Sequence, residues 1–233
     1  MRNPFFTIAI PTYEMYGKGV EFLDFNLKRL KEQTFQNFEV VVSDHSKNDE
    51  IKNLCSEWSN NLNINYHKKD YLIDNPSSNV NNLIKNSVGE YIKFIFQDDF
   101  LFKKESLEEI FDVLSKNSVE WLVTSSEHSR DGKTFFRTFH PHWNDSIFLG
   151  QNTFSSPSVL TIKNRTDVEL FDENLNWLMD VDYYYRMFLR FGLPYFLHNV
   201  NVVNRIWGSR LSDVLSDENK NNDLNKIKLK FNK

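Results

Sequence analysis

The sequence predicts an α/β fold with a mostly parallel central sheet and helices on both faces. Short apolar runs rich in β-branched and aromatic residues alternate with longer segments whose apolar residues recur at helical spacing. The connections between these segments are short. Because parallel strands need a crossover that a tight turn cannot provide, this alternation is typical of strands joined by right-handed helical crossovers.

The predicted elements follow one another in strict alternation along the first half of the chain. Continuous apolar runs predict buried strands, and apolar residues at i, i+3, i+4 and i+7 predict amphipathic helices. The predicted strands are 5–10 (FFTIAI), 38–43 (FEVVVS), 64–67 (INYH) and 91–96 (YIKFIF). The predicted helices contain, in order, Leu23, Leu27 and Leu30; Ile51, Leu54, Cys55 and Trp58; Val80, Leu83 and Ile84; and Leu107, Ile110, Phe111 and Leu114.

The regular alternation ends near residue 120. The segments 120–126 (EWLVTSS) and 133–140 (KTFFRTFH) have the composition of strands, and an aromatic stretch without a clear period follows them. A further helix is predicted at 181–192, because a glycine and a proline end it there. The last segment, 216–233, is polar and rich in Asn and Lys, so we expect a loosely ordered tail that can lie on a surface.

The composition limits the class of partner. The 28 Lys and Arg residues are outnumbered by 32 Asp and Glu residues, which argues against a general nucleic-acid binder. The apolar run at the start is too short to span a bilayer and reaches Pro11, so we expect at most peripheral contact with the inner face of a membrane. The lone Cys55 excludes an internal disulfide and, within a helical apolar stripe, indicates a buried thiol in a cytoplasmic protein.

Three groups of polar residues come directly after predicted strands. In parallel sheets of this kind, ligands bind at the carboxyl ends of the strands, so we expect these groups to converge on one crevice. The groups are Pro11-Thr12-Tyr13, Asp44-His45-Ser46 and Gln97-Asp98-Asp99.

The paired carboxylates of Asp98 and Asp99 interrupt an apolar run, GEYIKFIFQDDFL. One interpretation is a turn at the end of a strand, in which an aspartate accepts backbone hydrogen bonds. The other is a site for Mg²⁺ or Mn²⁺, which take one or two protein carboxylates and fill their other positions with phosphate oxygens and water. The glycine-rich alternatives for phosphate binding are absent: Gly17 and Gly19 begin a G-x-G-x-x-G pattern, but its last position is Phe22.

Several stretches together resemble the successive blocks of the family-2 glycosyltransferases of GT-A fold. They are IAIPTYE, VVVSDHSKND, the segment 81–89 running into GEYIKFIFQDD, SPSVLTIKN with LFDENL, and MDVDYYYR, and they span 5–211 in the family's order. The resemblance implies a Rossmann-like GT-A domain over 1–215 with a C-terminal acceptor-side region. In it, 1–118 would bind the nucleotide sugar, 119–215 would face the acceptor, and 216–233 would be a tail.

The resemblance also implies an activity. Members transfer a sugar from a nucleotide-diphosphate sugar, with inversion and with Mg²⁺ or Mn²⁺, to a glycan or lipid-linked acceptor. A UDP-sugar is the favoured donor, and surface polysaccharide biosynthesis is the expected role.

Individual residues acquire expected roles from their places in these blocks. Asp98 is expected to bind the metal as the last residue of the D-x-D block, with Asp99 assisting it. Asp180, at the start of a helix that should keep it ionised, is the expected catalytic base. The expected donor contacts are Pro11, Thr12, Tyr13, Asp44 (to the base), Asn81 and Asp98. The further candidate substrate contacts are Asp182, Arg186, Arg205, His140, His142 and Trp177.

Two departures from the family pattern keep an alternative open. The D-x-D block here reads Phe96-Gln97-Asp98, without its first carboxylate, and Trp207 stands where members often have His. A catalytically silent protein that binds a nucleotide or a sugar fits these departures. A nucleotidyltransferase is less favoured, because the start of the chain lacks the Gly-, Arg- and Lys-rich loop that binds a triphosphate. For Asp182 and Arg186 the alternative is a structural salt bridge, and for the histidines it is packing.

Overall fold

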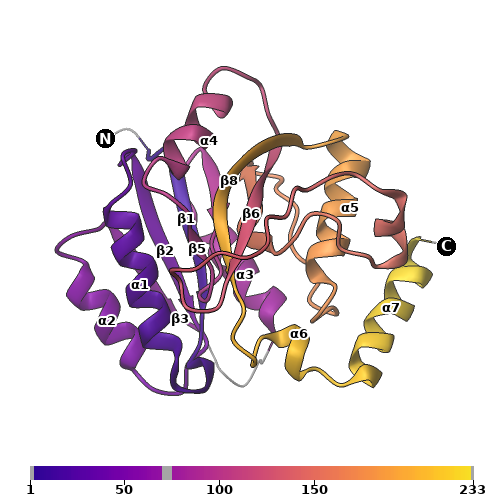
Figure 1. Ribbon diagram of the computed structural model, residues 1–233, viewed down its shortest axis with the longest axis horizontal. Coiled ribbons are helices and arrows are strands. Elements are labelled where there is room, and N and C mark those ends of the chain that lie inside the picture. The colour runs from indigo at the N-terminus through magenta and orange to yellow at the C-terminus, as the bar shows by residue number, and fades with distance from the viewer. Residues whose placement is uncertain (1–2, 70–74, 232–233) are drawn as a thin grey trace.

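The computed structural model describes residues 3–69 and 75–231, and within them one mixed sheet of eight strands runs through the molecule (Figure 1). The strands are β1 (Phe6–Thr12), β2 (Phe38–Asp44), β3 (Ile64–Lys68), β4 (Tyr91–Phe94), β5 (Phe100–Leu101), β6 (Trp121–Ser129), β7 (Leu160–Lys163) and β8 (Tyr195–Arg205). The helices are α1 (Gly19–Lys31), α2 (Glu50–Trp58), α3 (Pro76–Lys85), α4 (Ser106–Leu114), α5 (Met179–Phe191), α6 (Leu211–Val214) and α7 (Asp217–Phe231). Single 3₁₀ turns are η1 (Met15–Gly17), η2 (Asp145–Leu149) and η3 (Pro157–Val159).

The first half of the sheet is parallel, as the alternation predicts. Strands β3, β2, β1 and β4 are neighbours in that order, and each adjacent pair is parallel. The core of this half is apolar on both faces of the sheet, because residues such as Ile8, Val41 and Ile92 are fully buried. The register pairs Thr12 with Asp44, so the polar residues that end β1 and β2 lie side by side.

The second half of the sheet is mixed, and the sequence patterns describe it less well. Strand β7 lies antiparallel between β4 and β6, β8 is parallel to β6, and the short β5 is antiparallel to β8. The predicted strand at 133–140 is wrong, since this segment makes only isolated bridges between Ser126 and Phe139 and between Ser129 and Phe135. The register of β6 against β8 shifts around Ser125, which is the mark of a bulge.

The expectation of a loosely ordered tail is also wrong, because 217–231 forms α7. Leu224, Ile227 and Phe231 recur at helical spacing and pack on the core, and Asp223 is buried with them. Helix α7 lies beyond α5 at the end of the molecule opposite α2 (Figure 1). The last two residues of the predicted tail, 232–233, lie outside the described residues.

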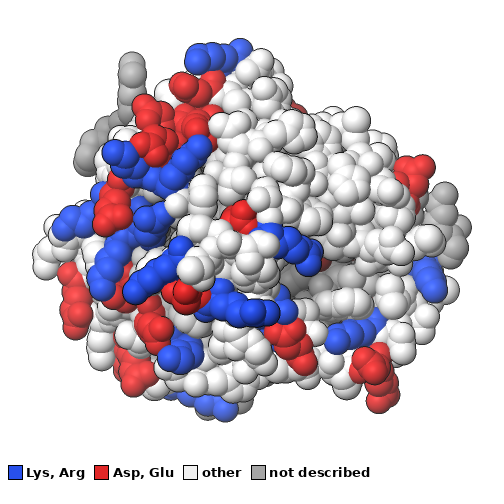
Figure 2. Space-filling view, in the orientation of Figure 1, with Lys and Arg blue, Asp and Glu red and all other residues white. Residues whose placement is uncertain are grey.

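Charged side chains are unevenly spread over the face that Figure 2 shows. Lys, Arg, Asp and Glu gather over the side of α1, α2 and α4, and the area over β8 is mostly uncharged. In the described part of the chain, no helix combines the length and the apolar character needed to cross a membrane.

Candidate active site

The loop between β1 and α1 is fastened by Gln97, the middle residue of the incomplete D-x-D block. Gln97 is buried, its Oε1 accepts a hydrogen bond from Tyr13 N at 2.9 Å, and its Nε2 donates to Gly19 O at 2.8 Å. Gly19 is required by this close approach, because a Cβ atom there would lie 2.3 Å from Tyr13 O. The middle residue of the block therefore holds the predicted donor loop in place.

Thr12 connects the ends of β1, β2 and α3. Its Oγ1 donates to Ser43 O at 3.2 Å, and its carbonyl oxygen accepts from His45 N at 2.9 Å and from Asn79 Nδ2 at 3.3 Å. Pro11 precedes it as the half-buried strand partner of Ser43. The structure thus brings Pro11, Thr12 and the start of the second polar group together, as expected.

Asp44 lies inside the protein and not on an open crevice. Its side chain has no exposed surface, its Oδ2 accepts from Tyr66 Oη at 2.6 Å and lies 3.3 Å from Lys68 Nζ, and its Oδ1 accepts from Ser46 N at 2.8 Å. Burial and the hydrogen bond to Asp44 raise the pKa of the Tyr66 hydroxyl. The expectation that Asp44 faces the crevice is wrong, because this carboxylate holds β3 and the turn after β2.

Asn81 is placed on the opposite side of α3 from the ends of β1 and β2. Its Nδ2 donates to Phe171 O at 2.9 Å and its Oδ1 accepts from Phe171 N at 2.7 Å, so the side chain ties α3 to a distant loop. Asn79 and Asn82, one turn apart, face those strand ends instead, and Asn82 Nδ2 donates to Ser43 Oγ at 2.8 Å. The buried Asn79 Oδ1 accepts no hydrogen bond from the described residues, so Asn79 is the better candidate for a ligand contact.

Asp98 lies at the end of the fourth predicted strand and is half-buried. Its Oδ2 accepts a hydrogen bond from Trp207 Nε1 at 2.9 Å, and its backbone oxygen accepts from Arg205 Nε at 3.1 Å. Burial raises the pKa of the Asp98 carboxyl, whereas the Trp207 bond and the charges of Arg205 and Arg210 oppose that rise. Trp207 therefore contacts one oxygen of the carboxylate that the resemblance assigns to a metal.

Arg205 is almost fully buried beneath this site. Its guanidinium carbon lies 4.6 Å from the centre of the Phe22 ring and 5.2 Å from those of Phe25 and Phe100. This packing fixes the Arg205 side chain, which supports the Asp98 backbone through its hydrogen bond to Asp98 O. The positive charge of Arg205 also lowers the pKa of the Asp98 carboxyl.

Asp99 has both of its oxygens occupied within the fold. Its Oδ2 accepts from Ser156 Oγ at 2.9 Å and from Ser158 Oγ at 2.6 Å, and its Oδ1 accepts from Arg205 N at 3.1 Å. Burial and the neighbouring Asp98 charge raise the pKa of the Asp99 carboxyl to about 7. This geometry joins the start of β5 to η3 and to the end of β8, and it gives no support to the prediction that Asp99 assists a metal.

The donor set fits a divalent cation only if the ligand supplies most of the coordination. Among the described residues, no group of three His, Cys, Asp or Glu side chains comes together in the way a metal cage requires. Asp98 Oδ1 accepts no hydrogen bond from another described side chain and is the available protein oxygen. One carboxylate suits Mg²⁺ or Mn²⁺ that arrives with diphosphate oxygens and water.

Asp180 lies in the first turn of α5, half-buried, with its carboxylate held from two sides. Asn152 Nδ2 donates to Asp180 Oδ2 at 2.6 Å, and Val181 N donates to Oδ1 at 2.8 Å. Burial raises the pKa of Asp180 to about 7, although both hydrogen bonds act to lower it. The expectation that the helix start keeps Asp180 fully ionised is therefore wrong, because the cost of desolvating the charge is the larger effect.

The loop that carries Asn152 also reaches Asp99. Asn152 Oδ1 accepts from Phe154 N and Ser155 N, each at 2.9 Å, and Ser155 adopts a left-handed backbone conformation with φ of 85°. The next residue, Ser156, donates to Asp99. No periodicity in the sequence marks Asn152 as a partner of Asp180; its Asx-type turn, N-T-F-S, is the one local signal.

Asp182 and Arg186 form a structural network away from Asp180. The fully buried Asp182 accepts from Arg186 Nε at 2.8 Å, and Lys230 Nζ lies 2.6 Å from its second oxygen in an ion pair that lacks hydrogen-bond geometry. Arg186 also donates to Glu169 Oε2 at 2.8 Å and to Leu170 O at 2.7 Å. The expectation that these two residues contact substrate is not supported, and the salt-bridge alternative describes them.

The remaining candidates lie on the surface around this region. His140 is exposed and its Nδ1 lies 2.8 Å from Ser125 Oγ, and the exposed His142 is held by its backbone N–H to Thr153 O, beside Asn152. Trp177 is half-buried, and Lys220 Nζ lies 5.8 Å from the centre of its ring. Of these three residues, His142 is the one that hydrogen-bonds to the loop that carries Asn152, the partner of Asp180.

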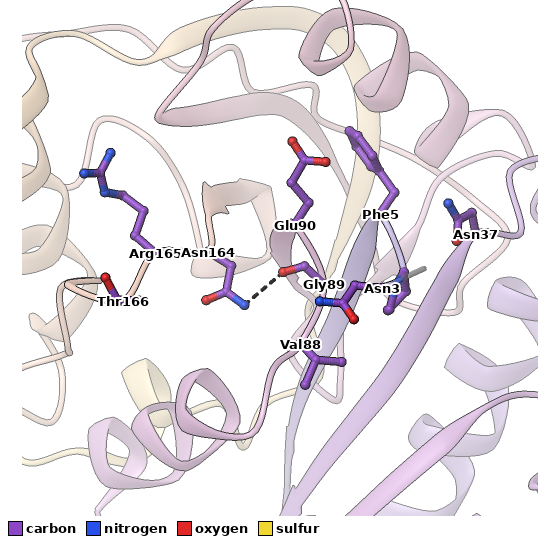
Figure 3. Close-up of a pocket in the computed structure, with 10 residues that line it drawn as sticks. Asn3, Phe5, Asn37, Val88, Gly89, Glu90, Asn164, Arg165 and Thr166 are labelled. Atoms are coloured by element: carbon purple, nitrogen blue, oxygen red, sulfur yellow. Dashed lines mark hydrogen bonds between the residues drawn. The ribbon is translucent and has the colours of Figure 1, made fainter. Parts of the chain in front are cut away.

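A hollow of about 680 Å³ lies at the other end of the sheet (Figure 3). Its lining includes Phe5, Asn37 and Glu90, which stand at the amino ends of the parallel strands, and Asn164 Nδ2 donates to Gly89 O at 2.9 Å on its wall. Ligands of parallel α/β sheets bind at the opposite end, so this hollow is not the candidate active site.

Solved structures with this fold include glycosyltransferases. Staphylococcus aureus TarS matches with a TM-score of 0.71 and 19% identity, over 97% of this chain and 39% of that chain. TarS 1–349 in complex with UDP-GlcNAc matches with a TM-score of 0.67 and 17% identity, over 91% of this chain and 61% of that one. The mannosyltransferase PcManGT from Pyrobaculum calidifontis, in complex with GDP-Man and Mn²⁺, has a TM-score of 0.61 and 14% identity, over 88% of this chain and 58% of its own. The shared architecture confirms the predicted GT-A type of α/β fold.

Sequence comparisons agree with the fold. An uncharacterized glycosyltransferase of Rickettsia felis is 27% identical over 179 residues, which are 72% of this chain and 28% of that protein. The poly(ribitol-phosphate) beta-N-acetylglucosaminyltransferase TarS of Staphylococcus aureus is 28% identical over 106 residues, 45% of this chain and 18% of TarS. The chain thus spans about 28% or less of the length of these relatives. The family model described as Glycosyl transferase family 2 matches residues 7–190, which is most of the chain, so the protein belongs to glycosyl transferase family 2.

Proposed function

We propose that this protein transfers a sugar from a UDP-sugar to a hydroxyl group of a glycan or lipid-linked acceptor, with inversion at the anomeric carbon. The observation that carries the proposal is the single loop 152–158, which hydrogen-bonds to Asp180 through Asn152 and to Asp99 through Ser156 and Ser158. Two carboxylate positions far apart in the sequence are thereby tied to one segment, next to the ends of the strands.

Asp180 is suited to accept the proton of the acceptor hydroxyl. A general base works best when its pKa lies near the working pH, and burial raises the pKa of Asp180 to about 7. Asn152 and Val181 N fix the two oxygens, so the carboxylate is held in one orientation. An ordinary exposed aspartate would be a weaker base in any orientation.

Asp98 would contribute to stabilising the leaving group. A bound Mg²⁺ or Mn²⁺ neutralises charge that develops on a departing diphosphate. Asp98 Oδ1 would hold that ion, Gln97 keeps the adjacent donor loop in place, and Arg205 supports the backbone at Asp98.

The nucleoside would lie against the ends of β1 and β2 and the face of α3 that carries Asn79. Asn79 Oδ1, which accepts no hydrogen bond within the described part of the chain, offers an acceptor there, and Asp44 shapes the same region through Tyr66 and Lys68. UDP-GlcNAc is our proposed donor, because the similar TarS was solved with UDP and with UDP-GlcNAc. A cytoplasmic role in surface polysaccharide biosynthesis agrees with the buried, unpaired Cys55.

One observation favours a second candidate, a silent nucleotide- or sugar-binding protein. Trp207 donates to Asp98 Oδ2, so part of the proposed metal site is already occupied by the protein itself. The retained and desolvated Asp180 favours the enzyme, since a binding protein has no need of a base with a pKa near neutrality.

A turnover assay separates the two candidates. Purified protein is incubated with UDP-GlcNAc and Mn²⁺, with and without a panel of glycan acceptors, and released UDP is measured. The proposal predicts UDP release that an acceptor stimulates and a product of inverted anomeric configuration. Binding of UDP-GlcNAc in calorimetry without release of UDP, for every acceptor, would establish the silent alternative.

A further inference from the structure

Helix α7 reaches back to the segment just before the proposed catalytic helix. One oxygen of Asp223, Oδ2, accepts hydrogen bonds from three consecutive backbone N–H groups: those of Asn176 at 3.0 Å, Trp177 at 2.7 Å and Leu178 at 3.2 Å. Asp223 itself is only 3% exposed. A buried carboxylate that receives three donors is a strong and specific anchor.

These N–H groups belong to the three residues that lead into α5, and no carbonyl group of the helix accepts hydrogen bonds from them. Leu178 occupies the N-cap position of α5 and makes no side-chain cap. Asp223, which lies 45 residues beyond Leu178, supplies the acceptor for the backbone donors that lead into this helix. The first turn of α5, with Asp180 in it, therefore begins from a backbone that α7 holds.

The position of Asp223 is itself well determined. Ile227 is fully buried one turn further along α7, and the ring of Phe231 packs edge-on against Tyr185 of α5 with 4.2 Å between centroids. Gly150 of the preceding loop gives Leu224 its space, because a Cβ atom at 150 would lie 2.5 Å from Leu224 Cδ2. These contacts dock α7 on the core and hold Asp223 in its position.

We propose that Asp223 is a positioning residue for Asp180, and that α7 is a working part of the active site. Asn152 holds the Asp180 side chain from one side, and Asp223 fixes the backbone from which that side chain projects. Helix α7 lies outside residues 7–190, the part of the chain that the family model matches. The catalytic half of the inference rests on the proposed function; the placement of the segment 176–178 does not.

Three variants test the inference. Asp223→Ala removes the acceptor, whereas Asp223→Asn keeps a side chain of similar size with one acceptor oxygen. The control is Leu54→Ala, which creates a cavity under α2 at the far end of the molecule (Figure 1). Each is compared with the wild type in thermal melting, in calorimetry with UDP-GlcNAc and Mn²⁺, and in kcat.

If Asp223 positions Asp180, then Asp223→Ala should lower kcat by more than its effect on thermal stability or on donor affinity explains. We expect Asp223→Ala to lower kcat by about 10- to 100-fold, since small misplacements of a reacting group cost this much, with the Kd for UDP-GlcNAc changed less than about twofold. Asp223→Asn should recover most of the rate. Leu54→Ala should melt earlier than the wild type and keep its kcat. If Asp223→Ala turns over as fast as Leu54→Ala, Asp223 only stabilises the fold and the inference is overturned.

A second measurement does not depend on turnover. Hydrogen exchange followed by NMR should show the amides of Asn176, Trp177 and Leu178 losing at least about tenfold protection in Asp223→Ala and not in Leu54→Ala. In the same variant, the carboxyl carbon of Asp180 should titrate at lower pH, because a loosened helix start admits water. Unchanged protection and an unchanged titration would overturn the inference. A wild type that transfers no sugar would instead refute the proposed function and leave these two readouts to decide the placement.

Discussion

Asn152 Nδ2 lies 2.6 Å from Asp180 Oδ2 and donates at the same time to Ser155 O at 2.9 Å. One side-chain amide therefore joins the first turn of α5 to the loop at Ser155. The residue after Ser155, Ser156, donates a hydrogen bond to Asp99. The relationship gives Asp180 a fixed direction and connects it to the strand ends where the donor is proposed to bind.

Transfer should depend on pH through Asp180. The base works only when ionised, so kcat should rise with pH and level off above about 7, the value to which burial raises the pKa of this carboxyl. The Asn152 bond favours the ionised form, so Asn152→Ala should raise that pKa further and move the rise in kcat to higher pH. Profiles of kcat against pH, with the surface variant Asn117→Ala as control, measure the shift. A midpoint that stays where the wild type has it would show that Asn152 does not act on the base.

Asp44→Ala should weaken the binding of UDP and also destabilise the fold. The change leaves Tyr66 Oη and Ser46 N without their acceptor, whereas Lys68 Nζ keeps its bond to Asn48 O. Polar groups that become unpaired in this way cost about 1 to 3 kcal/mol of unfolding free energy. Tyr66→Phe is the matched control, because it removes one donor and leaves the carboxylate. Calorimetric melting and UDP titration are the measurements. A folded Asp44→Ala protein that binds UDP as tightly as the wild type would exclude any part for Asp44 in the nucleoside site.

The early elements follow from the sequence because burial there is periodic. The buried, mostly apolar β1 and β2 and the amphipathic α1 and α2 need no information from distant residues, and each forms where the pattern predicts it. Strand β8 was not predicted, because polar residues interrupt its apolar pattern and its first half is largely exposed. Helix α7 was not predicted, because Lys and Asn separate its few apolar residues, although Leu224, Ile227 and Phe231 lie on one face.

The site was predictable as a location and less so as a set of contacts. Position after a strand correctly placed Thr12 and Asp98 at one end of the sheet. It could not reveal that Asp44 and Asp99 have all their oxygens engaged inside the fold, or that Asn152 meets Asp180, because these depend on how distant loops pack.

Removing the indole donor of Trp207 should strengthen metal binding. Trp207→Phe keeps an aromatic ring beside Phe22, with which Trp207 packs edge-on at 5.2 Å between centroids, and frees Asp98 Oδ2. We expect Mn²⁺ to bind several-fold more tightly in the presence of saturating UDP, since one protein interaction no longer competes with it. Calorimetry of Mn²⁺ into the UDP complex measures this. Equal or weaker binding of Mn²⁺ by the variant would mean that Trp207 supports the metal site.

Asp98 and Asp99 should differ in their effect on the metal dependence of UDP binding. In the wild type, UDP should bind more tightly with Mn²⁺ than in EDTA, because one carboxylate and the diphosphate hold the ion together. Asp98→Asn keeps an acceptor for Trp207 and removes the charge, so this difference should disappear. Asp99→Asn should retain it, with a lower melting temperature from the altered bonds to Ser156 and Ser158. The reverse pattern would assign the metal to Asp99.

The rate of sugar transfer by Asp180→Asn tests directly whether Asp180 is the catalytic base. The substitution keeps the size of the side chain and removes the base, so transfer from UDP-GlcNAc should fall by roughly 10² to 10⁴ under conditions where chemistry limits turnover. Donor affinity should hardly move. Because the pKa of Asp180 is raised in the folded state, its ionisation destabilises the fold as pH rises toward about 7. At pH values above neutral, the melting temperature of the variant should therefore equal or exceed that of the wild type. Transfer at nearly the wild-type rate by the folded variant would show that Asp180 is not the base of this enzyme.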